Sequence, residues 1–204
     1  MRRPTLQAKN ITVKEGGSFF DLLYKGQSYK VAVPVYGDYN IANVLAAIGT
    51  ALHFEYHIED IISVLPQLES PEGRFQVMEG PNNQKVILDY AHTPVAHTRL
   101  VEEVKKMEYN QLIVITVDHP GHHDPNVIVD QVMTGFSNPS ASNIHRAPTR
   151  TEGVLKSLSL GKPNDIILLT SGCINGAQLV KGNEIPHSDE EIIASYYASL
   201  SSIS

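Results

Sequence analysis

The chain has 204 residues, of which 42% are hydrophobic and 19% charged, so it can bury a core as one or two globular domains. Its formal net charge is −6 and lysine and arginine form no cluster, which argues against a nucleic acid as partner. No apolar run approaches the roughly 20 residues that span a bilayer, and no signal-peptide core follows the first residues. The single cysteine, Cys173, fits a reducing compartment, so we expect a cytoplasmic protein without a membrane partner.

The amino-terminal part is rich in residues that favour β-strands. Three such segments, Ile11–Lys14, Ser18–Tyr24 and Ser28–Val35, are separated by glycine turns at Gly16-Gly17 and Lys25-Gly26. This pattern predicts a β-meander or a pair of hairpins.

From residue 37 the spacing of apolar residues changes to three and four, which is typical of an amphipathic helix. The spacing predicts a helix over residues 37–54 and a shorter one over about 58–65. The polar segment from Glu69 to Gly73 has the composition of a linker. We therefore expect two parts, residues 1–70 and residues 71–204.

In the second part, apolar strands alternate with helices. This alternation indicates an α/β fold with a mostly parallel, Rossmann-like sheet, in which ligands bind at the carboxyl ends of the strands. Three predicted helices have a recognisable start, at Thr93-Pro94, at Asp124-Pro125 and at a capping box of Ser188 and Glu191. A further helix is predicted over about residues 150–160, ending at Gly161. The predicted strands are residues 86–91, 112–117 and 165–170.

The segment TVDHPGHHDP, residues 116–125, concentrates histidine and aspartate at one predicted strand end. It could bind a metal, bind a substrate or begin a helix. A metal-dependent hydrolase would use the residues His119, His122, His123 and Asp124, with the bound ion activating water. The spacing suits no standard metal cage, and we favour the substrate-loop interpretation.

Three motifs occur in the order and on the elements found in one enzyme family. GDYNIANVLAA (37–47), GRF (73–75) and LDYAHTP (88–94) resemble segments of the Mur ligases, and the last is typical of the branch that adds the third peptide residue. The resemblance covers most of the chain. It implies that residues 1–70 are the end of the ATPase-like central domain and that residues 71–204 are the carboxyl-terminal domain.

The resemblance implies an ATP-dependent, amide-forming ligase of peptidoglycan precursor synthesis, with ATP and Mg²⁺ as cofactors. Its substrates would be a UDP-linked muramoyl peptide and an amino acid. By the same resemblance, Asn43 lies near the adenine, Arg74 and Asp89 near the ribose and phosphates, and His92 beside the nucleotide. Aspartate suits sugar hydroxyls, and the guanidinium fork of arginine suits phosphate.

Each of these residues also has a purely structural interpretation. Asn43 could cap its helix, Arg74 could be a solvated linker charge, and Asp89 could bond the local backbone. His92 could be a structural histidine. The joint occurrence of the motifs favours the functional interpretation.

The same resemblance identifies the histidine-rich segment as the loop that receives the incoming amino acid. Gly121 stands where members that select diaminopimelate carry arginine, so that specificity is in doubt, and lysine or another amine fits as well. In TSGCINGAQ (170–178), only Gln178 matches the family pattern clearly, and Asn175 replaces a glutamate that would hold a substrate ammonium. The residues implied in substrate binding are Asp118, His119, Pro120, Asp124, Ser171 and Asn175.

The sequence departs from the family in two further ways. No Gly-x4-Gly-Lys-Ser/Thr phosphate-binding motif occurs in the 204 residues, and a βα unit expected after the strand at 112 is missing. We therefore expect a partial or degenerate relative that is inactive by itself, with a non-catalytic module for nucleotide or amino acid as the alternative. Residues 1–70 would expose a sheet edge through which chains could associate.

Overall fold

The computed structural model describes residues 6–14, 16–116, 121–134, 138, 140, 144–147, 149–171 and 176–201. The chain forms two compact units. The first consists of Met1–Phe75 with Thr98–Glu108, and the second of Gln76–His97 with Tyr109–Ser204. Each unit has its own sheet, and each is described here by itself.

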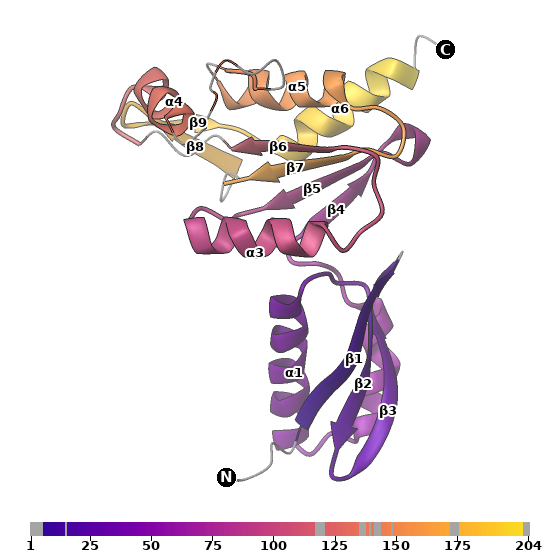
Figure 1. Cartoon of the computed structure of the whole chain (residues 1–204). Coiled ribbons are helices and arrows are strands. Elements are labelled where there is room, and N and C mark those ends of the chain that lie inside the picture. Colours follow the sequence, from indigo (N-terminus) through magenta and orange to yellow (C-terminus); the bar gives the residue numbers. More distant parts are fainter. Residues whose placement is uncertain are drawn as a thin grey trace. The chain divides into compact units, whose positions relative to one another are not determined.

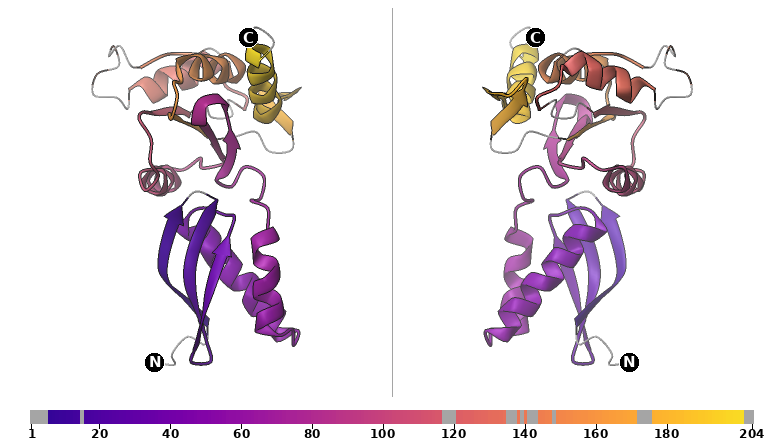
Figure 2. Two further views of the ribbon diagram at one scale, coloured as in Figure 1. Left: turned by 90° about the vertical axis from the view of Figure 1, so that its right-hand side faces the viewer. Right: turned by 90° about the vertical axis from the view of Figure 1, so that its left-hand side faces the viewer.

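The first unit contains an antiparallel sheet in the order β1-β2-β3, as the β-meander pattern predicts. Figure 2 shows its strands side by side. At the turn between β2 and β3, Lys25 and Gly26 both have positive φ, 46° and 84°, as in the tight turns that suit the twist of a hairpin. The strands are β1 (Leu6–Lys14), β2 (Gly17–Tyr24) and β3 (Gln27–Val33).

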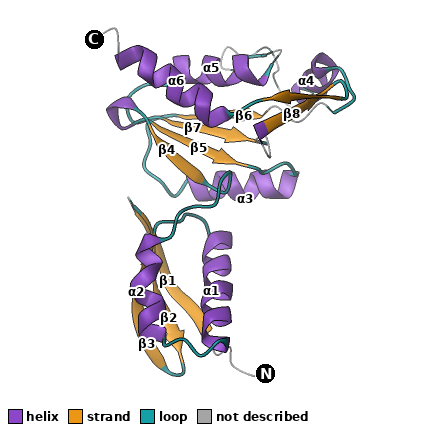
Figure 3. Cartoon of the chain, turned by 180° about the vertical axis from the view of Figure 1, so that it is seen from behind, coloured by secondary structure: helices purple, strands orange, loops and turns teal. Residues whose placement is uncertain are grey.

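Two helices cover one face of this sheet, α1 (Asp38–His53) and α2 (Ile58–Val64), and both were predicted. A 3₁₀ turn, Leu65–Gln67, continues α2 (Figure 3). Alternate residues of β2 and β3 meet the apolar stripe of α1, because side chains of a strand alternate between its two faces. The buried residues of this core are Phe20, Leu22, Val31, Val33, Val35, Ile41, Val44, Ile48, Ile58, Ile61 and Leu65.

The opposite face of the sheet is polar at its centre. Lys9, Asp21 and Lys30 are directly opposite one another across the three strands, and the Lys30 ammonium is 2.6 Å from the Asp21 carboxylate. Next to Lys9, the pairing of β1 shifts at a bulge where Asn10 has a φ of 53°. Bulges and charges are devices that make a sheet edge a poor template for another strand. The association through this edge stays a prediction.

The second unit contains a sheet in the order β4-β5-β7-β6 (Figure 1). Strands β5, β7 and β6 are parallel, as predicted, and β4 is an antiparallel strand that sequence analysis missed. Because Asp89 pairs with Thr170, and Thr170 with Thr116, the three parallel strands end level with one another. The strands are β4 (Gln76–Glu79), β5 (Lys85–Asp89), β6 (Leu112–Thr116) and β7 (Ile166–Thr170).

Helices α5 and α6 lie together over one face of this sheet (Figures 1 and 3). Their apolar residues Val154, Leu158 and Ile193 meet the even-numbered side chains of β5, namely Val86 and Leu88. A hairpin of two short strands, also missed from the sequence, precedes α6. The remaining elements are α3 (Pro94–Val104), α4 (Pro125–Met133), α5 (Arg150–Leu160), β8 (Ala177–Val180), β9 (Asn183–Pro186) and α6 (Asp189–Ser201).

The predicted helix starts are confirmed by their capping bonds. The Thr93 hydroxyl accepts a hydrogen bond from the amide of Ala96 (3.3 Å), the Asp124 carboxylate accepts one from Asn126 (2.9 Å), and the Ser188 hydroxyl accepts one from Glu191 (3.1 Å). These bonds satisfy amides that the first helical turn leaves without a partner. Among the residues that the structure describes, the helices are too short or too polar to cross a membrane.

Candidate functional site

Two of the predicted site residues meet at the carboxyl edge of the second sheet. Asp89 ends β5 and is 5% exposed, and its carboxylate accepts a hydrogen bond of 2.8 Å from the amide of Ala91. Ser171 follows β7 and donates to the carbonyl of Ala91 from both its amide and its hydroxyl, each at 3.0 Å. Ala91 therefore links Asp89 to Ser171. The local backbone bond suggested for Asp89 is confirmed, and it orients the carboxylate at the strand end.

His92 lies one residue beyond this link. Its Nδ1 is 3.0 Å from the carbonyl of Tyr90, so the tautomer with a proton on Nδ1 donates to that oxygen. The side chain is exposed. The predicted residues Asp89, His92 and Ser171 thus share one edge of the sheet, where parallel sheets bind ligands.

In the first unit, Asn40 connects two further predicted residues. Its side-chain amide donates to the carbonyls of Tyr36 (2.8 Å) and Arg74 (3.3 Å), and its Oδ1 accepts from Asn43 at 3.5 Å. Asn40 is buried. The N-cap of α1 is Gly37, which makes no side-chain cap bond, so the interpretation of Asn43 as a helix cap is wrong. Asn43 and the backbone of Arg74 instead belong to one hydrogen-bonded group.

Arg74 lies in a turn that is held on both sides. Gly73 and Phe75 have left-handed φ values of 61° and 52°. The Phe75 ring is 1% exposed and stacks on Tyr36 with centroids 5.5 Å apart, which offsets the strain of that conformation in an aromatic residue. The Arg74 side chain is exposed. Arg74 belongs to the first unit and Asp89 to the second, so their joint action on one ligand stays a prediction.

The end of the histidine-rich segment is attached to the tip of the β8–β9 hairpin. The amide of Gly121 donates to Leu179 (3.1 Å), and the amide of Gly182 donates to Gly121 (2.9 Å). Gly121 adopts a φ of 58°, which favours glycine. Lys181, at the hairpin tip, also pairs with Asp124 at 2.8 Å.

Both carboxylate oxygens of Asp124 contact groups of the protein, and its side chain is 41% exposed. The pKa of its carboxyl is lowered from the ordinary value, mainly by the hydrogen bond from Lys181 and next by the hydrogen bond from the Asn126 amide. The described residues contain no group of three potential metal ligands. The metal-site hypothesis therefore gains no support from them. Of its other proposed members, His122 and His123 are exposed, and His119 lies outside the described residues.

The predicted residues Asp118, His119, Pro120 and Asn175 all lie outside the described residues, so their expected roles stay predictions. For the implied cofactors, the exposed Arg74 and the strand-end Asp89 are side chains suited to a nucleotide. The described residues contain no set that would hold Mg²⁺.

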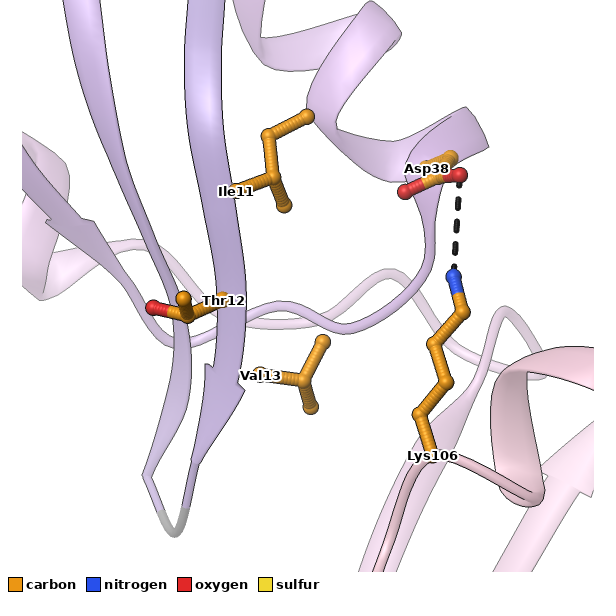
Figure 4. A pocket seen from close by; sticks show the side chains of 5 residues that line it. All are labelled: Ile11, Thr12, Val13, Asp38 and Lys106. Carbon is orange, nitrogen blue, oxygen red and sulfur yellow. Dashed lines mark ion pairs between the residues drawn. The ribbon is translucent and has the colours of Figure 1, made fainter.

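Two pockets lie away from the predicted residues. One, of about 480 Å³, is in the first unit and is lined by Ile11, Thr12, Val13, Asp38 and Lys106. Figure 4 shows Ile11 and Val13 directed into it and Thr12 turned away, with Lys106 reaching toward Asp38 at 3.7 Å. The other, of about 470 Å³, is in the second unit and is lined by residues 144–147 with Glu152 and Lys156. Neither pocket contains a predicted site residue.

Sequence analysis missed a buried ionic cluster beside the candidate site. The Arg150 guanidinium donates to the Asp189 carboxylate from Nε (2.9 Å) and Nη2 (2.6 Å), and from Nη1 to the carbonyl of Thr170 (2.9 Å). His187 Nε2 is 2.8 Å from Asp189. Burial alone would raise the pKa of Asp189, but the hydrogen bonds from His187 and Arg150 outweigh it and hold the pKa below 3.8. The partners Arg150 and Asp189 are 39 residues apart, and no local pattern connects them.

Comparison with known proteins gives a consistent result. Residues 2–51 match the family model of the Mur ligase middle domain. A UDP-N-acetylmuramoyl-L-alanyl-D-glutamate–2,6-diaminopimelate ligase of Bacillus cereus is 28% identical, over 93% of this chain and 43% of the relative. The corresponding L-lysine ligase of Staphylococcus haemolyticus is 26% identical, over 91% of this chain and 42% of the relative. The chain thus spans less than half the length of these relatives.

Solved structures share the fold. The MurF ligase of Thermotoga maritima, solved in complex with ADP, aligns with 98% of this chain and 48% of its own, with a TM-score of 0.63 and 14% identity. At this identity the likeness concerns the fold, and the predicted α/β class is confirmed.

Proposed function

Because this chain is a homologue of the Mur ligases over most of its length, we propose that it forms the carboxyl-terminal half of an ATP-dependent, amide-forming ligase of peptidoglycan precursor synthesis. The observation that carries the proposal is the link from Asp89 through Ala91 to Ser171 at the carboxyl edge of β5 and β7. It joins a residue proposed for the nucleotide to one proposed for the amino acid. A cytoplasmic location is part of the same proposal.

On the nucleotide side, each residue has a role that its chemistry suits. Asp89 accepts hydrogen bonds from the ribose hydroxyls, and Arg74 neutralises the phosphates with its fork of donors. We assign Asn43 to the adenine and place His92 beside the nucleotide, and the carbonyl of Tyr90 orients the His92 ring. ATP supplies the phosphoryl group that activates a substrate carboxylate, and Mg²⁺ accompanies the nucleotide.

On the amino-acid side, we assign substrate contacts to Asp118, His119, Pro120, Asp124, Ser171 and Asn175. The attachment of Gly121 to the hairpin supports this role, because it fixes the end of the segment. The relatives include ligases named for diaminopimelate and for L-lysine. Since Gly121 offers no guanidinium for a second carboxylate, a substrate with one carboxylate, such as L-lysine, fits this segment better.

The direct test is calorimetric titration of the purified chain with ATP and ADP. Asp89→Asn keeps an oxygen that can accept from Ala91 but removes the charge, so we expect Kd to rise about tenfold or more. Asp21→Asn, on the polar face of the first sheet, is the matched control and should leave Kd unchanged. Equal affinities of wild type and Asp89→Asn would overturn the nucleotide site.

A second candidate is a non-catalytic module that binds nucleotide or amino acid and acts with another polypeptide. Such a module needs no phosphate-binding loop of its own, and the 204 residues contain no Gly-x4-Gly-Lys-Ser/Thr. Both candidates predict binding without turnover by this chain alone. Phosphate release by the chain alone at millimolar ATP and Mg²⁺ would contradict both candidates. Turnover that requires added protein bearing the missing motif would favour the ligase.

A further inference from the structure

The side chains of Arg150, Asp189 and His187 form a buried cluster in the second unit. The side chains of Arg150 and Asp189 are 1% and 3% exposed. Removing two charges from water is costly, and well-packed apolar residues stabilise such a position equally well or better. Because stability alone does not require these buried charges, we looked for a role of the cluster other than packing α5 against α6.

The geometry indicates such a role, because the cluster reaches the strand end that carries the candidate site. Arg150 uses its third nitrogen, Nη1, on the carbonyl of Thr170, the last residue of β7. The backbone amide of His187 donates to the carbonyl of Gly176 at 2.9 Å. Both Arg150 and His187 bind Asp189. Arg150 also contacts the backbone of residue 170, and His187 contacts that of residue 176.

The residue after Thr170 has an unusual backbone conformation. Ser171 is buried and has a φ of 54°, in the left-handed region that a serine rarely adopts. Such a conformation persists only where its surroundings determine it, and it is common at functional sites. On one side of Ser171, Arg150 holds the Thr170 carbonyl, and on the other side Ser171 itself binds Ala91.

We propose that Arg150, Asp189 and His187 are positioning residues, which fix the corner at Thr170–Ser171 and, through Ala91, the carboxylate of Asp89. This inference rests on the proposed function, since it assigns the cluster to the site at the ends of β5 and β7. The chain of contacts is continuous from His187 to Asp89. It consists of hydrogen bonds of 3.0 Å or less and of the peptide bond that joins Thr170 to Ser171.

The test separates positioning from simple stabilisation. In the double variant Arg150→Met/Asp189→Leu, apolar side chains of similar size replace the ion pair, which preserves packing but leaves the Thr170 carbonyl without its donor. Val154→Ala, a buried change on the same helix, is the control for general destabilisation. The measurement is amide hydrogen exchange at Ala91 and Ser171, followed by NMR, at matched global stability.

If the cluster positions the corner, these two amides exchange about tenfold faster or more in the double variant than in Val154→Ala, while other amides of β5 and β7 do not differ. Equal exchange in the two variants would overturn the proposal. Should the double variant not fold, Arg150→Lys serves instead, because one ammonium cannot reproduce the fork that binds Asp189 and Thr170 together.

Titration with ATP provides a second measurement, because a purely stabilising role of the cluster would leave the Kd for ATP unchanged. We expect the double variant to bind ATP about tenfold more weakly than Val154→Ala. If the amides of Ala91 and Ser171 exchange faster in the double variant but neither the wild type nor any variant binds ATP, the positioning role is supported. The proposed nucleotide function is then overturned, while the positioning proposal stands. Unchanged affinity despite faster exchange would overturn the link to Asp89.

Discussion

The two sheets of this protein differ in how far their faces are exposed to solvent. In the first unit, strand β2 alternates between buried residues such as Phe20 and more exposed ones such as Phe19, and charged residues cross the outer face. In the second unit, every residue of β7 is buried. An antiparallel sheet can leave one face in water, whereas a parallel sheet between helices cannot. Substitutions should therefore have effects that depend on the face in one unit and not in the other.

The largest contrast should be between the ion pairs of the two units. Truncating Asp189 to alanine leaves the buried Arg150 without its counter-charge, which should cost about 3–5 kcal/mol of unfolding free energy. Lys30→Ala removes the lysine of the Asp21–Lys30 pair, whose ammonium side chain is 89% exposed and screened by solvent, and should leave the urea midpoint almost unchanged. Urea denaturation of both variants measures the difference. Similar midpoints would contradict the contrast.

Apolar truncations provide the next test. Leu168→Ala, at the centre of β7, should cost about 2–5 kcal/mol, because the cavity cannot be filled by solvent. Phe19→Ala, on the outer face of the first sheet, should cost about 0.5 kcal/mol or less. Phe20→Ala, one residue along on the inner face, controls for the size of the side chain and should cost about 3–5 kcal/mol. A large loss from Phe19→Ala would indicate that a partner covers the outer face.

A smaller effect concerns helix starts. The Ser188 hydroxyl caps α6, so Ser188→Ala should cost about 1 kcal/mol. Gly37, which begins α1, has a φ of 88° and no cap bond, so Gly37→Ser should gain nothing from its hydroxyl and lose stability through strain. Thermal unfolding of both variants tests this. Stabilisation by Gly37→Ser would contradict the expectation.

The last prediction concerns alkaline pH. Burial, with a contribution from Tyr196, raises the pKa of Tyr197 from 10.0 to about 12. Folding therefore favours the protonated phenol, and this contribution to stability is complete below pH 10 and is lost as the pH rises toward 12. We expect the stability of Tyr197→Phe, followed by circular dichroism, to fall less over this range than that of the wild type. Parallel losses would show that other groups govern alkaline unfolding.

Local patterns were sufficient for much of the fold. The apolar runs predicted β5, β6 and β7, and the capping residues Thr93, Asp124 and Ser188 predicted where helices begin, because both signals depend on neighbouring residues. The missed strands β4, β8 and β9 have only four residues each. A signal for the last two was available in Lys181-Gly182, which resembles the confirmed hairpin turn at Lys25-Gly26.

The candidate site was predictable in part. The rule that ligands bind at the ends of parallel strands brought Asp89 and Ser171 to the same edge, where the structure links them. The contact of Asn40 with the backbone of Arg74 was not predictable, because it depends on how residues 73–75 return to α1. The pairing of Arg150 with Asp189 likewise depends on the packing of two helices across β7.

Gly121 has a consequence for how the selectivity of this protein could evolve. A Cβ atom at this position would meet open space, but its residue would have to adopt a left-handed conformation that costs roughly 1–2 kcal/mol. The hydrogen bonds with Leu179 and Gly182 prevent the backbone from relaxing. A mutation to arginine at position 121 would therefore lower the stability of the protein unless the hydrogen bonds of this residue with Leu179 and Gly182 were also lost. If the proposed function is correct, lineages that acquired a new amino-acid preference at this loop should carry accompanying changes in the hairpin.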